Sequence, residues 1–207
     1  APEFFAHIVG GTASNAPDGF TYPNVGKPFY SVPGQSVQLT KDGEPFDIFL
    51  PPMADGDIET LSNDAPTNVG LGSAGKNSLT SLLAPNSVRD DLGNTFDEAA
   101  IIPVPPDRIP EPLPEGLEMP VVVSVQTFGG TRFDSPAPVQ FPNLPDPVTG
   151  EVLQPGDSTG LWSFNHDAGH WELQGRMTVS EDGLYLVTDP GVGIRAPGWH
   201  GPANANS

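Results

Sequence analysis

Residues 121–127, VVVSVQT, carry the clearest strand pattern in this chain. The pattern has the period of two expected when one face of a sheet is more buried: Val121, Val123 and Val125 alternate with Val122, Ser124 and Gln126. Further short apolar runs follow at a spacing of about ten residues, which favours a sandwich or a barrel; they are PVQF (138–141), TGLWSF (159–164), HWELQ (170–174), RMTVS (176–180) and LYLVT (184–188). We predict an all-β fold, namely an antiparallel β-sandwich with long Pro/Gly-rich loops and an extended N-terminal arm.

Glycine and proline make up a large share of the sequence, with 24 and 26 residues among 207. Such a share approaches the range that is typical of low-complexity disorder. The prolines, however, flank apolar runs such as 121–127 and 184–188, which is typical of strands separated by rigid turns. Because the chain is also long enough to bury a core, we expect one ordered domain with long loops.

The N-terminal part of the chain lacks a sustained hydrophobic period. Residues 1–35 are rich in glycine, proline, asparagine and aromatic residues, and we predict an extended arm there. The next stretch, SVQLT (36–40) and PFDIFLPP (45–52) around an Asp42–Gly43 turn, predicts a hairpin.

Two further segments lie outside the strand pattern. Residues 62–97 are polar and small, which predicts a loop insertion, and within it only SLTSLLA (78–84) could support a short helix. We therefore predict a β-sandwich module over 36–201, interrupted by this insertion, and a C-terminal tail over 202–207.

Acidic residues outnumber basic ones by 26 to 8, which gives a formal net charge of −18. A polyanion is repelled by nucleic acids and by anionic lipid surfaces, so nucleic-acid binding is excluded. No membrane insertion is expected, because no run of roughly 18 apolar residues is present. The dispersed acids favour solubility or the collection of divalent cations. The absence of cysteine fits a protein secreted without disulfides and equally a cytosolic one.

Two short motifs resemble parts of serine hydrolases. IVGGT (8–12) and GDSTG (156–160) are similar to the new amino terminus and the nucleophile loop of chymotrypsin-like proteases, but no histidine stands in the setting that this mechanism needs. A Gly-x-Ser-x-Gly nucleophile also needs a strand before it and a helix after it, whereas Ser158 follows LQPGD and precedes the strand-like LWSF. We interpret Ser158 as part of a turn and predict no enzymatic activity; a hydrolase would require a histidine close to it.

Candidate metal ligands occur at two places. His166 and His170 have a metal-ligand spacing only on a helix, and Gly169 favours a hairpin turn instead. Asp55, Asp57 and Glu59 in DGDIE resemble part of a calcium loop, because hard cations take clustered oxygens. A solvated strand edge is the alternative interpretation of these three residues. We expect no cofactor apart from calcium, for which a looser site with Asp64 stays open, and Asp189 has the same ambiguity.

An ordered series of motifs resembles a known module. It comprises FLPP (49–52), a proline-rich stretch (103–145), LQPGDSTGLWSFNHDAGHWELQGRMTVSEDG (153–183) and TDPGVGIRAPGWHG (188–201). Together they are similar to a β-sandwich module of large bacterial secreted and surface proteins, including some with YD repeats. That module is distantly similar to the sandwich domain of zonula occludens proteins, ankyrins and netrin receptors. Self-cleavage at His-Phe-Ser, known in that wider family, is not carried over, because this chain has Trp162-Ser163-Phe164-Asn165-His166.

The resemblance implies an extracellular or cell-surface location and a non-catalytic structural role in cell-surface architecture, adhesion or filament assembly. The expected partners are further copies of the chain or neighbouring domains of the same surface protein. We predict that the arm associates through its apolar residues, namely Phe4, Phe5, Ile8 and Val9. Trp199 is predicted to fold back as an apolar lid over one end of the sandwich. A calcium-assisted glycan-binding module that uses Trp162, Trp171 or Trp199 is the alternative function.

Overall fold

The chain is all-β, as predicted. The computed structural model describes residues 3–30, 34, 36, 40–41, 44–45, 50–71, 76–105, 109 and 113–203. Within this part every regular element is a strand except two 3-10 turns, η1 (Gly10–Thr12) and η2 (Asp55–Asp57). The described part contains no helix with the length and apolar character needed to cross a bilayer.

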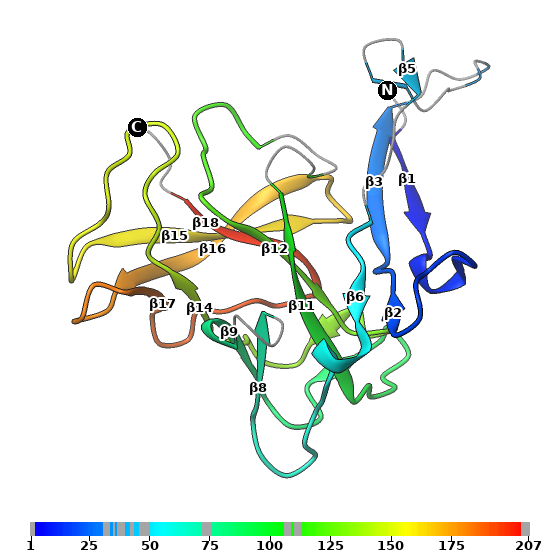
Figure 1. The fold of residues 1–207 in the computed structure, drawn as a ribbon, viewed down its shortest axis with the longest axis horizontal. Coiled ribbons are helices and arrows are strands. Elements are labelled where there is room, and N and C mark those ends of the chain that lie inside the picture. The colour runs from blue at the N-terminus through cyan, green and yellow to red at the C-terminus, as the bar shows by residue number, and fades with distance from the viewer. Residues whose placement is uncertain are drawn as a thin grey trace.

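One sheet of the described chain closes on itself (Figure 1). It contains ten strands, of which β7 (Glu59–Thr60) pairs with β11 alone, so the remaining nine form a ring. The ring closes because β12 pairs with β11 as well as with β18. In spatial order its strands are β12 (Val122–Gln126), β18 (Gly198–Ala203), β15 (Ser158–Asn165), β16 (His170–Val179), β17 (Tyr185–Thr188), β14 (Val139–Pro142), β9 (Lys76–Leu83), β8 (Thr67–Leu71) and β11 (Glu98–Val104).

The closed ring replaces the predicted antiparallel sandwich. Two stacked sheets would leave free edges, whereas β11 has described partners on both sides and joins the two ends of the sheet. In addition, β11 and β8 pair in parallel at Ile101 and Leu71, while all other neighbours in the ring are antiparallel. The alternation of apolar residues identified several of these strands, but the two predicted runs at 170–174 and 176–180 form the single strand β16. The same alternation is compatible with a sandwich and with a closed ring.

The strand over 122–126 is buried on both faces, which explains its valine-rich sequence. Val123 and Val125 face the large core inside the ring, whereas Val122 belongs to a second core with Trp199 and Phe164. The sequence predicted that one face of this strand is more buried than the other, whereas all five residues of β12 are buried.

The predicted loop insertion over 62–97 supplies two strands of the ring, β8 and β9, and the short strand β10 (Val88–Arg89). The stretch 78–84, which the sequence allowed as a short helix within this loop, lies largely in β9, where Leu79 and Leu83 are buried and Leu82 is 42% exposed. Leucines four residues apart fall on one face of a helix and also on one face of a strand. Their pairing with β8 and β14 selects the strand.

The remaining described pairings involve short strands outside the ring. β10 pairs with β13 (Arg132–Phe133), β2 (Phe20–Thr21) with β6 (Met53–Ala54), and β4 (Thr40–Lys41) with β5 (Glu44–Pro45). The last pair flanks the predicted Asp42–Gly43 turn; Asp42, Gly43 and most of the two predicted strands lie outside the described residues.

The N-terminal arm is a hairpin rather than one extended segment. β1 (Glu3–Ile8) pairs with β3 (Val25–Tyr30) along its whole length and stands beside the ring (Figure 1). Val25 packs into the second core, and Asn24 exchanges hydrogen bonds with Gln126 of β12. At the other end, β18 extends to Ala203, so the predicted tail begins too early and its last residues, 204–207, lie outside the described chain.

Candidate functional site

Aromatic rings gather where the β15–β16 turn meets β18. We call Phe164, His166, Trp171 and Trp199 the aromatic cluster. Phe164 is its centre, with ring centroids 5.3 Å from His166, 5.7 Å from Trp171 and 4.9 Å from Trp199. Edge-to-face pairs of this kind contribute about 0.5–1.5 kcal/mol each beyond area burial. The cluster therefore anchors the turn to β18.

A serine and a histidine meet beneath this cluster. Ser163 of β15 stands opposite His200 of β18, and Ser163 Oγ lies 2.7 Å from His200 Nδ1. Both residues are buried. Burial, followed by repulsion from His166, lowers the pKa of His200 to about 3, although the Ala196 carbonyl favours the protonated ring. Nε2 of His200 has no hydrogen-bond partner among the described residues. The imidazole is therefore neutral at physiological pH.

His166 lies at the border between the cluster and the N-terminal hairpin. Its ring stands 5.2 Å from that of Trp199, and a Cβ at Gly198 would lie 2.4 Å from its Nε2. Burial lowers the pKa of His166 to about 4; Asp167 opposes this shift, and His7 of β1 adds to it. Three of the four histidines in the sequence thus influence one another at this border.

The resulting Ser–His pair has the distance of a nucleophile and a base but not the access. Ser163 lies in the interior of a paired strand, and no described carboxylate is hydrogen-bonded to His200 to orient it as a triad would require. The arrangement holds two strands together. The sequence contains no local signal for it, because 37 residues separate the partners.

The predicted serine motif is a turn that enters a strand. Residues 155–156 form the turn, and β15 begins at Ser158, which is exposed and pairs with Thr178. The IVGGT stretch runs from the end of β1 into η1. Among the described residues, no hydrogen bond or ion pair joins one of these motifs to the other.

The histidine pair lies in the predicted hairpin turn. Asn165 pairs with His170, and Gly169 adopts a φ of +70°, which glycine tolerates best. His170 is exposed and 3.2 Å from a Glu172 carboxylate oxygen, whereas His166 points into the cluster. The two imidazoles therefore have separate environments.

The acidic ladder lies on η2 and β7, with Asp55 and Asp57 in the helical turn and Glu59 in the strand. In the part of the chain that the structure describes, no three acidic or histidine side chains gather closely enough to hold a metal ion. Asp189 has structural partners: its carboxylate accepts hydrogen bonds from Thr178 and Arg176, which lower its pKa.

Trp199 is an interior residue of β18 and not a lid. β18 lies between β12 and β15, and the Trp199 side chain is 2% exposed as a member of the aromatic cluster. β18 begins at Gly198, which pairs with Val125 of β12.

A hollow of about 200 Å³ lies elsewhere, between the loop after β14, the segment before β12 and the end of β18. Asn143 Nδ2 donates to the carbonyls of Leu153 and Gly183, and its buried Oδ1 has no hydrogen-bond partner among the described residues. The lining of the hollow includes three carboxylates and no basic side chain. The carboxylates belong to Glu118, Asp146 and Glu151. This lining disfavours an anionic ligand.

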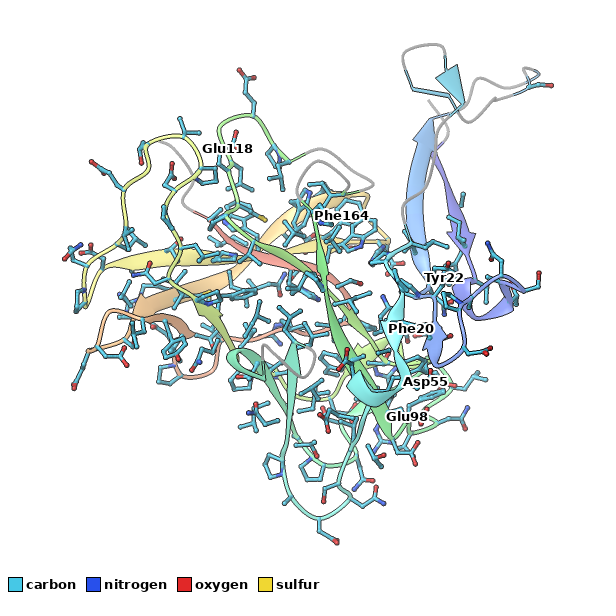
Figure 2. All side chains as sticks on the ribbon, in the orientation of Figure 1. Phe20, Tyr22, Asp55, Glu98, Glu118 and Phe164 are labelled. Carbon is cyan, nitrogen blue, oxygen red and sulfur yellow. The ribbon has the colours of Figure 1, made fainter. Side chains whose placement is uncertain are left out.

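One exposed aromatic residue, Phe20, lies where the arm meets the ring. Phe20, 43% exposed, pairs through its backbone with Ala54, and the Asp55 N–H donates to the Gly19 carbonyl at 2.9 Å. Figure 2 shows Phe20, Tyr22, Asp55 and Glu98 on this side of the molecule. This arrangement has no periodic signal in the sequence, because β2 and β6 are only two residues long.

Comparisons with protein-family models, with curated proteins and with solved structures give no match for this chain.

Proposed function

We propose that this chain is a non-catalytic structural module that serves cell-surface architecture, adhesion or filament assembly by associating with copies of itself or with neighbouring domains. The observation that carries the proposal is the N-terminal hairpin. It pairs six residues of β1 with six of β3 outside the closed ring, and no other strand of the described residues pairs with the outer edge of either one. An extracellular location and a relationship to β-sandwich modules are part of the proposal and rest on the motifs of residues 36–201.

The polar chemistry of the described residues supports a structural role. The Ser163–His200 pair is enclosed, and Trp162 Nε1 donates to the carbonyl of Ala203 at 3.0 Å. Arg176 and Asp189 form an ion pair that links β16 to the end of β17. These groups stabilise strand contacts rather than a reaction centre.

The apolar assembly residues predicted from sequence have mixed environments. Ile8 is half-buried and Val9 is 49% exposed at the end of β1. Phe4 and Phe5 lie within β1, but their side chains are outside the described residues. The proposal therefore rests on the backbone edge of β1 rather than on these rings.

The test is the mass of the intact chain in solution as a function of concentration. We expect sedimentation to show reversible association. A strictly monomeric chain at every concentration would contradict self-association. In parallel, a fluorophosphonate probe should label neither Ser158 nor Ser163, and labelling of either one would contradict the non-catalytic assignment.

Calcium-assisted glycan binding remains the second candidate, favoured by the exposed Phe20 beside Tyr22 and Asp55 (Figure 2). The tryptophans that sequence analysis assigned to this function are covered: Trp171 and Trp199 are buried, and Trp162 is half-buried. Titration of neutral oligosaccharides with and without calcium tests this candidate. Binding that Phe20→Ala abolishes would support it, with Leu173→Ala as the control for an exposed apolar residue in β16.

A further inference from the structure

The closed ring offers no complete edge to an added strand. Each of its nine strands has a described neighbour on both sides, from β12 next to β18 around to β11 next to β12. An arm strand added to the ring of a neighbouring copy therefore lacks an acceptor edge in the described sheet. The available edges belong to the hairpin, where β1 and β3 pair with each other alone among the described strands.

The two hairpin edges differ in quality. β3, VGKPFY, contains Pro28, which has no N–H to donate, and glycine next to Val25. β1, EFFAHI, contains neither proline nor glycine and a single acidic residue, Glu3. Figure 1 shows β1 on the side of the hairpin away from the ring, with β3 between them. The outer edge of β1 is thus the better template for another strand.

We infer that β1 pairs with β1 of a second copy, antiparallel and centred on Phe5, which joins two hairpins into a four-stranded sheet. The inference rests on the proposed self-association and specifies its partner and geometry. In this register Glu3 stands opposite the partner's His7, and Phe4 stands opposite the partner's Ala6. The two Glu3–His7 pairs are equivalent, and one lies on each side of the two-fold axis.

The charge arrangement favours this register. Opposite charges across antiparallel strands stabilise a pair and like charges destabilise it. Each chain carries a net charge of −18 with histidine counted as neutral, so an interface between two copies is favoured when a carboxylate lies opposite a hydrogen-bond donor such as His7 and not opposite another carboxylate. A symmetric pairing also closes after two copies, whereas a head-to-tail contact would continue into a filament.

The experiment reverses these charges in the intact chain and measures the dimer dissociation constant by sedimentation. Glu3→Lys should raise the constant roughly tenfold, because each of the two pairs loses the carboxylate that can accept a hydrogen bond from the partner's His7. His7→Lys should tighten the dimer, and the double exchange Glu3→Lys with His7→Glu should restore it. Asp18→Lys, in the exposed loop between β1 and β2, changes the net charge as much as Glu3→Lys and should leave the dimer unaltered.

A second measurement uses the unmodified chain, so it does not depend on the folding of any variant. Hydrogen exchange of the β1 amides should slow with concentration, while exchange in β15 and β16 stays constant. Association that ignores both charge variants, or polymers larger than a dimer, would overturn the inference while leaving the proposed self-association intact. A chain that stays monomeric would overturn both.

Discussion

Ser163 and His200 are hydrogen-bonded across two neighbouring strands, with Oγ and Nδ1 2.7 Å apart in the protein interior. Both side chains are buried. This hydrogen bond gives Ser163 Oγ and His200 Nδ1 a partner in the interior and specifies which residues of β15 and β18 stand opposite each other. Its value to the protein is therefore strand register, and this leads to a prediction about stability.

Ser163→Ala should destabilise the fold by about 1–3 kcal/mol, because it leaves a buried imidazole nitrogen without a partner. Adding His200→Leu should recover part of this loss, since removing both polar groups avoids the unpaired atom. Urea unfolding of the two single variants and the double variant measures the coupling. Additive free energies would show that the two side chains do not act as a pair.

Stability should fall in mild acid. The native pKa values of His200 and His166 are about 3 and about 4, below the ordinary value of 6.5, chiefly because of burial. Below pH 6.5 the unfolded chain binds more protons at these two histidines than the native chain does. The free energy of unfolding therefore falls as the pH drops from 6.5 toward 4 and then 3. Above pH 6.5 both states hold neutral imidazoles, and stability no longer depends on these two groups.

Denaturant unfolding across this pH range checks the acid prediction. His166→Gln should flatten the dependence because it removes one depressed group. The matched control is His170→Gln on the same turn, an exposed position beside Glu172. A pH dependence that responds equally to both substitutions would argue against the buried histidines as its source.

Trp199→Ala should cost about 3–5 kcal/mol, because it empties a buried site within the aromatic cluster. Leu173→Ala, at a 58% exposed position of β16, should change stability by less than about 0.5 kcal/mol. Thermal unfolding of both variants decides the point. Equal effects would mean that the cluster does not anchor β18.

Millimolar calcium should shift the melting temperature little, because Asp55, Asp57 and Glu59 do not converge with other described ligands. A specific site at one hundred times its dissociation constant would add about 2.7 kcal/mol. Melting curves with calcium and with a chelator make the comparison. A large saturable rise that Asp57→Asn removes would restore the calcium site predicted from the sequence.

Several elements were predictable because their causes are local. The strand at 121–127, the paired strands around the 165–170 turn and the end of β17 before Asp189 follow from alternation and turn chemistry. Gly169 adopts the positive φ that its turn requires. Such signals depend on the residue and its immediate neighbours, so one sequence suffices to detect them.

Other features depend on which distant segments meet. Leu79 and Leu83 satisfy both the helical and the strand period, and β9 is a strand because β8 and β14 provide its hydrogen-bond partners. Ring closure likewise needs β11 to reach both β8 and β12. The Ser163–His200 contact joins residues 37 positions apart. Alternation specifies that a strand has two faces, but the neighbour at each edge follows from the packing of the whole chain.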